Sequence, residues 1–196
     1  MIIAVTPYEL LTEQHIQRLN LIEPHIDGVL LRTPMRQQRL IEWLHVLLRE
    51  GFPKSKVIIH TDITLAKDMG IQRLHFREGD EQAFDLKSTH PSYSVSMSVH
   101  CVESIIKAHN HRLDFGLFGH IFPSASKEGT PPRTSTEVCA ALSEHLPLIA
   151  IGGIDQNTVM RVDPKFIGIA CIRSVFDTPI KVFDEMVQKW RMNKEE

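Results

Sequence analysis

Short apolar runs alternate with longer amphipathic segments along the whole chain. The runs are rich in Val, Ile, Leu and Phe, which is typical of strands that are covered on both faces. A repeated strand and helix pattern predicts parallel strands joined by right-handed crossovers. The eight predicted strands are Ile2–Val5, Gly28–Leu31, Val57–Ile59, Arg73–Phe76, Tyr93–Val99, Phe115–Gly119, Leu148–Ile151 and Phe166–Ala170.

Three of the intervening segments carry clear helix signals. Apolar residues recur at helical spacing over Leu40–Leu48, and a glycine follows as a stop. Thr134 and Glu137 have the spacing of a capping box, which predicts the start of a second helix. Thr178 and Pro179 predict the N-cap and the first helical residue of the last helix.

Eight such units predict an α/β fold in which residues 1–196 form a single domain, a compact (β/α)8 TIM barrel. The chain is short for this fold, which typically has ~250 residues. One connection, Arg77–Pro91, is so weakly patterned that we expect only a short helix there. The alternative is a doubly wound open sheet, which usually has fewer strands at this length.

Composition and charge exclude several classes of function. Apolar residues make up 42% and charged residues 23% of the chain, as in ordinary globular proteins. The net charge of -2 argues against a nucleic-acid partner but leaves a local phosphate site open. No apolar run approaches the ~20 residues that cross a bilayer, so no membrane partner is expected. Three scattered cysteines without a CxxC pair, and an N-terminus unlike a secretion signal, predict a cytoplasmic protein.

The most informative loop follows the sixth predicted strand, because the active sites of such barrels are built from loops at the C-terminal strand ends. His120 would lie at this mouth, where a histidine can act as general acid or base. The alternative is a histidine that only hydrogen-bonds the loop backbone. Ser124, Ser126 and Lys127 suit a carboxylate or a phosphate, or else they form a solvated polar loop.

The loops after the seventh and eighth predicted strands predict a phosphate site, since these loops frequently bind phosphate in such barrels. Gly152 and Gly153 would let the backbone approach a ligand closely, or else they form a tight turn. Arg173 and Ser174 would complete the site, or else they only lead into the last helix. Arg32, after the second strand, would pair with an anionic ligand or with a structural carboxylate. No zinc site is predicted, because no third ligand is suitably spaced from the nearby pair of histidines at 109 and 111.

Six blocks of the sequence are the most distinctive: Leu30-Leu31-Arg32, Ile58–Asp62, Leu74-His75-Phe76, Ser98-Val99-His100, Phe118–Lys127 with Gly129–Arg133, and Ala150–Ile154. Together they resemble the thiamine phosphate synthase superfamily over nearly the whole chain. Two activities occur in that superfamily. Thiamine phosphate synthases join a thiazole phosphate to a pyrimidine pyrophosphate, whereas TenI-type thiazole tautomerases aromatise a thiazole carboxylate phosphate.

The sixth-strand block favours the tautomerase. Synthases usually carry Gly-Pro there and tautomerases carry Gly-His, which is the pair found at Gly119 and His120. The resemblance therefore implies an isomerase of thiamine biosynthesis with His120 as its catalytic residue. It implies a small-molecule thiazole phosphate as substrate, no metal and no organic cofactor. It also allows a homodimer, since barrels of this family are often dimers.

Departures from the synthase pattern point in the same direction. An aspartate that helps to hold magnesium in synthases is Thr61 here, and the synthase Lys after the second strand is Pro34. Asp80 remains at the second metal position, but one carboxylate is thin support for magnesium. Three alternatives stay open: a thiamine phosphate synthase, another phosphate-handling barrel enzyme, and a phosphate-ligand-binding or regulatory relative without catalysis.

Overall fold

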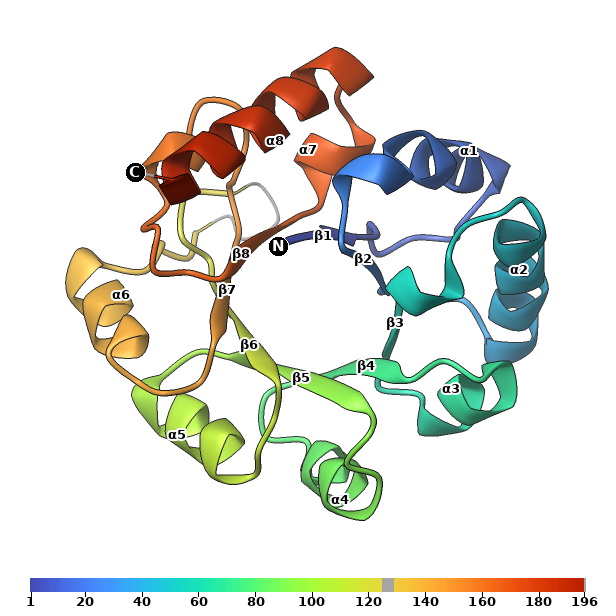
Figure 1. Cartoon of the computed structure of the whole chain (residues 1–196), viewed down its shortest axis with the longest axis horizontal. Coiled ribbons are helices and arrows are strands. Elements are labelled where there is room, and N and C mark those ends of the chain that lie inside the picture. Colours follow the sequence, from blue (N-terminus) through green and yellow to red (C-terminus); the bar gives the residue numbers. More distant parts are fainter. Residues whose placement is uncertain (125–128, 196) are drawn as a thin grey trace.

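Eight parallel strands form a closed barrel in the order β1 to β8, and β1 pairs with β8 to close it (Figure 1). The computed structural model describes residues 1–124 and 129–195. The predicted (β/α)8 barrel is confirmed. The strands are β1 (Ile2–Val5), β2 (Gly28–Leu31), β3 (Val57–His60), β4 (Arg73–Phe76), β5 (Ser94–Val99), β6 (Phe115–Gly119), β7 (Leu148–Ile151) and β8 (Gly168–Cys171).

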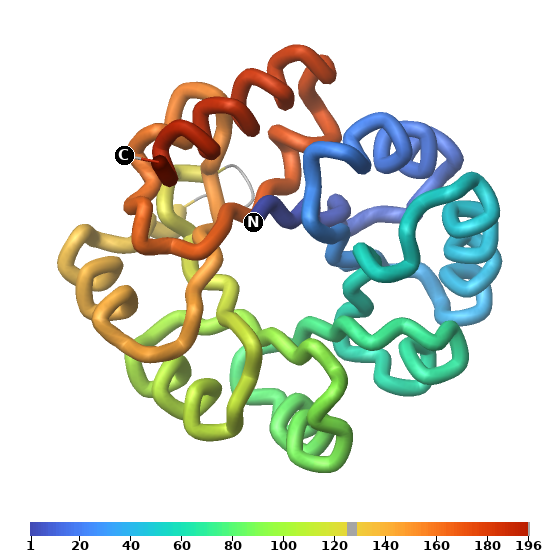
Figure 2. The backbone as a smooth tube through the Cα atoms, in the orientation of Figure 1, coloured from blue at the N-terminus to red at the C-terminus, as the bar shows by residue number. Residues whose placement is uncertain are grey.

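Helices surround the strands as an outer ring, and the chain winds once around the barrel axis (Figure 2). The last helical segments therefore lie beside the first strand and its helix. The helices are α1 (Glu13–Ile22), η1 (Glu23–His25), α2 (Gln37–Arg49), η2 (Lys54–Lys56), α3 (Ile63–Met69), α4 (Glu81–Thr89), α5 (Val102–Asn110), α6 (Ser135–Leu142), η4 (Val159–Arg161), α7 (Arg173–Phe176) and α8 (Ile180–Glu195). None of the described helices is both long and apolar enough to span a membrane.

Helix α4 is more regular than its weak pattern predicts. The Asp80 side chain caps it by accepting a hydrogen bond from the backbone N–H of Gln82 (3.1 Å). Its apolar residues Ala83, Phe84 and Leu86 are all buried. A cap and three buried side chains are enough to fix a helix of nine residues.

The last helix begins one residue later than predicted. The carbonyl of Pro179 accepts hydrogen bonds from the N–H groups of Val182 (3.0 Å) and Phe183 (3.2 Å). Pro179 therefore precedes the helix instead of being its first residue, and α8 starts at Ile180. The capping box of Thr134 and Glu137 is confirmed at the start of α6.

The barrel contains two apolar cores, which follow from the alternation of side chains along each strand. The larger core lies between the strands and the helices and includes Ala4, Val29 and Leu31. The smaller core lies inside the barrel, because its members alternate with those of the larger one. It consists of Ile3, Val5, Leu30, Ile58, Phe115, Leu117, Ile149 and Ala170.

The connection from β7 to β8 holds only the 3₁₀ turn η4 where a seventh α-helix would be expected. Helix α8 covers this turn. The side chain of Asn193 donates a hydrogen bond to the carbonyl of Val162 (2.8 Å), and Lys189 donates one to the carbonyl of Gln156 (2.9 Å). The last helix thus covers a connection that has no α-helix of its own, which shortens the chain that the barrel needs.

Candidate functional site

The connections after β7 and β8 lie side by side at the C-terminal end of the barrel, because Ile151 pairs with Ala170 across the two strands. The hydroxyl of Ser174 donates a hydrogen bond to the carbonyl of Ile154 and joins the two connections. Gly152 and Gly153 adopt φ angles of 100° and 67°, a region that favours glycine. The four residues predicted to bind phosphate are therefore brought together.

Backbone N–H groups supply hydrogen-bond donors where the connections after β7 and β8 meet. Within the described residues, the N–H groups of Gly153, Arg173 and Ser174 donate no hydrogen bond to another protein group. Residues Arg173 and Ser174 open the short helix α7, and the Arg173 side chain is exposed. Free N–H donors beside an exposed guanidinium suit an anion such as phosphate. We call residues 152–153 and 173–174 the phosphate loops.

His120 follows β6 directly and lies half-buried beside the phosphate loops. The peptide bond between Gly119 and His120 is cis. The imidazole Nε2 lies 3.2 Å from the carbonyl oxygen of Thr130. A carbonyl oxygen only accepts hydrogen bonds, so Nε2 carries the proton. In the neutral ring Nδ1 then holds the lone pair and is the basic nitrogen.

Arg133 holds the backbone on both sides of this histidine. Its Nε donates to the carbonyl of Gly119 (3.2 Å), and its backbone N–H donates to the carbonyl of His120 (2.9 Å). The guanidinium is held in turn by Glu137, 3.0 Å away. Hydrogen bonds from Thr134 and Arg133 lower the pKa of Glu137 to about 2, so this carboxylate stays charged. The capping box of α6 thereby orients the residue that fixes His120.

The inside of the barrel is polar on one side. Alternate residues of β3, β4 and β5 face inward, and at the upper levels they are His60, His75, Ser96 and Ser98. His75 is only 3% exposed, and its two nitrogens contact Ser96 Oγ (2.9 Å) and Ser98 Oγ (3.0 Å). Burial, and next the neighbouring His60, lower the pKa of His75 to about 3. This ring is therefore neutral near pH 7.

The direction of these hydrogen bonds follows from a backbone carbonyl. Ser96 donates its only hydroxyl hydrogen to the carbonyl of Leu74 (3.2 Å), so it accepts from Nδ1–H of His75. Nε2 of the neutral ring then accepts from the hydroxyl of Ser98. The Ser98 oxygen is left as a hydrogen-bond acceptor toward the upper end of the barrel, where it is half-buried.

His60 lies above His75, with 6.2 Å between the ring centroids. Burial, and next the positive charges of Arg77 and Arg32, lower the pKa of His60 to about 4, while Asp80 opposes this effect. Arg32 is exposed, and its guanidinium lies 4.9 Å from the centre of the Tyr8 ring. Arg32 is thus placed at the mouth, as predicted, and it follows β2, which only β1 separates from β8.

The remaining predicted residues are divided between described and undescribed parts of the chain. Ser124 is half-buried shortly after His120. Ser126 and Lys127 lie outside the described residues. The three cysteines, Cys101, Cys139 and Cys171, are free thiols.

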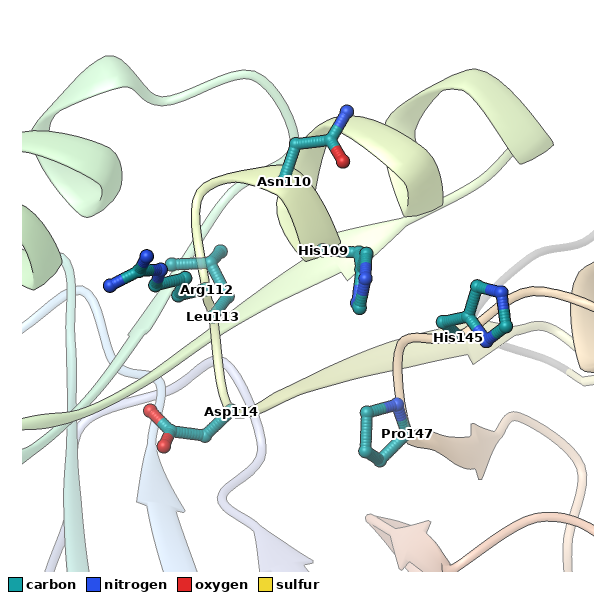
Figure 3. A pocket seen from close by; sticks show the side chains of 7 residues that line it. All are labelled: His109, Asn110, Arg112, Leu113, Asp114, His145 and Pro147. Carbon is teal, nitrogen blue, oxygen red and sulfur yellow. The ribbon is translucent and has the colours of Figure 1, made fainter.

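One hollow that described residues form lies away from the mouth. It is an open depression at the N-terminal end of β6 and β7, lined by His109, Asn110, Arg112, Leu113, Asp114, His145 and Pro147 (Figure 3). The rings of His109 and His145 are tilted by 40° to one another, with centroids 5.5 Å apart. No group of three or more His, Cys, Asp or Glu side chains that fits a metal ion occurs in the described part of the chain. Because barrel chemistry is built at the other end, we place the candidate active site at the mouth.

Sequence reasoning missed the inward-facing polar side chains of β3 to β5 as site residues. A signal for them exists in the strict alternation of serine with apolar residues over Ser94–Val99. A strand covered on both faces is normally apolar throughout. Alternation within a barrel strand therefore marks a polar interior.

Comparisons with known proteins agree with this architecture. The TMP-TENI family model, described as thiamine monophosphate synthase, matches residues 2–175. A thiamine-phosphate synthase of Lysinibacillus sphaericus is 31% identical over 101 residues, which cover 50% of this chain and 47% of the relative. One of Listeria welshimeri is 29% identical over 110 residues, covering 54% and 53%. The chain thus matches about half the length of these curated relatives.

Solved structures show the same fold at low identity. A thiamine phosphate pyrophosphorylase from Pyrococcus furiosus superposes with a TM-score of 0.76 at 19% identity, covering 99% of this chain and 95% of that one. A 3-hexulose-6-phosphate synthase from Salmonella typhimurium gives 0.75 at 12% identity, covering 98% and 100%. At these identities the likeness concerns the fold alone.

Proposed function

This chain belongs to the TMP-TENI family of thiamine biosynthesis, and from that premise we propose that it is a thiazole tautomerase. Its substrate would be the ylidene tautomer of a 2-carboxy-4-methylthiazole ethyl phosphate, and its product the aromatic ring. The observation that carries the proposal is His120. The histidine stands at the strand end beside the phosphate loops, and its tautomer leaves Nδ1 as the basic nitrogen.

The reaction needs one proton to leave and one to arrive. Nδ1 of His120 takes the proton from ring C2, and the C–H electron pair becomes a ring C=N bond. The double bonds shift so that C4 and C5 become doubly bonded within the ring. The exocyclic carbon beside C5 then takes a proton, and no atom is lost overall. General acid–base help of this kind contributes ~10²–10⁴-fold.

The phosphate loops would anchor one end of the substrate. Backbone donors at Gly153, Arg173 and Ser174 are fixed by the Ser174 contact with the β7 connection. An anchored phosphate holds the ring near the imidazole, and this saves the entropy of bringing the two together. A ring held over the polar side of the barrel also meets the acceptor oxygen of Ser98.

Magnesium, which synthases of this superfamily use, does not fit the residues present. Thr61 stands where the resemblance places one carboxylate ligand, and its hydroxyl donates to the carbonyl of His60 (2.8 Å). An Oδ1 atom of Asp80 caps α4. Two carboxylates and their waters would be expected for a magnesium diphosphate site. We therefore derive no step through a metal ion.

Thiamine phosphate synthesis is the second candidate, and the names of the relatives favour it. Both relatives described above are called thiamine-phosphate synthases. That reaction forms a carbon–nitrogen bond and releases pyrophosphate, so it needs charge neutralisation of the leaving group. Its test is magnesium-dependent formation of thiamine phosphate from the two phosphorylated halves.

The deciding experiment follows the ylidene substrate by ultraviolet absorbance or NMR with native protein, His120→Gln and His145→Gln. His145 is exposed at the other end of the barrel and serves as the control. We expect native protein and His145→Gln to accelerate aromatisation. His120→Gln should lose about 10²–10⁴-fold of the rate while it still binds product. The proposal is wrong if native protein gives no acceleration over buffer, and the synthase assay then decides the alternative.

A further inference from the structure

We propose that Arg32 and Arg77, on either side of His60, form a carboxylate-binding subsite at the barrel mouth, separate from the phosphate loops. The subsite rests on the proposed function for the identity of its ligand, the carboxylate on ring C2. It goes further by assigning that carboxylate to two named arginines. Arg77 belongs to no site that the sequence analysis predicts.

Strand register places the three side chains together. Leu31 pairs with Ile59, so Arg32 follows β2 at the level where His60 ends β3. His60 pairs with His75, and Arg77 is the next inward position along β4. Leu30 and Ile58 belong to the core inside the barrel, so the residues two further along, Arg32 and His60, lie on the same side.

The two arginines at this point lack a protein counter-ion. Within the described residues, neither guanidinium lies within 4.0 Å of a carboxylate oxygen. Asp80 lies close enough to oppose their effect on His60, but its Oδ1 accepts hydrogen bonds from Gln82 at the start of α4. Two guanidinium groups without a carboxylate partner are well suited to an incoming carboxylate, which they bind through charge-assisted hydrogen bonds.

His60 fits this role because it remains neutral. Burial and the two arginine charges hold its pKa near 4, so it adds no third positive charge at neutral pH. A neutral imidazole still donates one N–H to an anion. The backbone beneath Arg32 is fixed as well, since Thr6 Oγ1 accepts from its N–H (2.8 Å) and donates to its carbonyl (2.9 Å).

The position of the subsite matches a ligand with two anionic ends. In the closed order of strands, β3 is four strands away from β7 and β4 is four strands away from β8, so His60 and Arg77 lie across the mouth from the phosphate loops. Arg32, after β2, lies two strands away from β8 and flanks His60 on the nearer side. A substrate with phosphate at one end and carboxylate at the other would span the mouth. Its reacting ring would then lie between the two anchors.

The test compares two ligands by isothermal titration calorimetry: the aromatic carboxythiazole phosphate and its decarboxylated counterpart. Native protein, Arg77→Gln, Arg32→Gln and the control Arg39→Gln on the exposed face of α2 are used. We expect Arg77→Gln and Arg32→Gln to weaken binding of the carboxylated ligand about tenfold or more, as for a charged hydrogen bond. Affinity for the decarboxylated ligand should stay within about twofold of native.

Two results would overturn the subsite. The first is an equal loss of affinity for both ligands, which would mean a general electrostatic effect, and the second is an Arg77→Gln protein that behaves like Arg39→Gln. In either case the proposed tautomerase function would still stand, because it does not depend on this subsite. Failure of native protein to bind either thiazole ligand would instead reject the proposed function together with its subsite.

Discussion

A Cβ atom added to Gly152 would lie 2.3 Å from the Cβ atom of His120, so the connection after β7 packs directly on the histidine. Two backbone hydrogen bonds join the same region to the loop after β6. The N–H of Ile121 donates to the carbonyl of Ile151 (3.0 Å), and the N–H of Phe122 donates to the carbonyl of Gly152 (3.0 Å). The candidate catalytic residue and the phosphate loops are therefore parts of one packed unit.

Gly152→Ala should displace His120 and lower turnover. The new methyl group has no space, and φ at Gly152 is 100°. A shift of about 1 Å in a catalytic group can cost about 10²-fold in rate, so we expect kcat to fall at least tenfold. Steady-state kinetics with the ylidene substrate measure this.

Gly51→Ala is the matched control for that variant. Gly51 has a φ of 99°, but a Cβ there meets nothing within 4 Å. Both variants carry a left-handed alanine, which costs about 1–2 kcal/mol of stability. Only Gly152→Ala should lose turnover, and equal kinetics in the two proteins would contradict the packing argument.

Ser174→Ala should loosen the phosphate loops. It removes the hydroxyl that donates to the carbonyl of Ile154 and joins the two connections. If the lost hydrogen bond lowers the binding free energy of inorganic phosphate by about 0.5–1.5 kcal/mol, phosphate binds about two- to tenfold more weakly. Calorimetric titration with phosphate measures it.

Ser143→Ala provides the comparison for the Ser174 variant. Its hydroxyl also donates to a backbone carbonyl, that of Cys139 (2.8 Å), but at the end of α6 away from the loops. This variant should keep native phosphate affinity. If both serine variants bound phosphate equally well, the Ser174 contact would have no role in the site.

His75 should make the fold sensitive to acid. An unfolded histidine takes up its proton near pH 6.5, whereas burial lowers the pKa of His75 in the folded barrel to about 3. Between these values the unfolded state binds more protons, so the free energy of unfolding falls as the pH falls. From pH 6.5 to pH 4 the loss from this residue is roughly 3 kcal/mol.

Urea unfolding of native protein and of His75→Asn at several pH values between 7 and 4 measures this effect. Asparagine does not titrate, so the variant should be less stable near pH 7 but lose stability less steeply toward acid. His145→Asn, at an exposed position, should keep the native slope. If the free energy of unfolding fell equally steeply with pH in native protein and in His75→Asn, His75 would take up its proton at the same pH in the folded and unfolded states, and the prediction would be wrong.

The strands could be predicted closely because each is a short apolar run bounded by polar residues. Five of them begin and end as predicted. β8 differs most, since Phe166 and Ile167 were expected in the strand. In the structure the N–H of Phe166 closes a turn on Asp163 (3.1 Å), and pairing with β7 begins at Gly168. Apolar content alone does not reveal where strand pairing starts.

The candidate site also has parts that could be predicted from the sequence and parts that could not. His120, Arg32 and the phosphate loops could be placed from the sequence, because the fold assigns the C-terminal strand ends to one face. His75 and Arg77 could not, because their roles depend on which strands become neighbours and on which side chains face inward. The tautomer of His120 depends on a contact with the backbone carbonyl of Thr130, and no sequence pattern places that carbonyl beside the imidazole.

The packing of α8 on the connection between β7 and β8 has a consequence for the order in which the protein is made. Asn193 and Lys189 of this helix hold the connection that carries Gly152 and Gly153. Strand β1 in turn needs β8 as its neighbour before the barrel closes. A chain emerging from the ribosome therefore exposes His120 long before its anion site can form. Binding of phosphate by nascent chains of increasing length should begin only once α8 is free to pack.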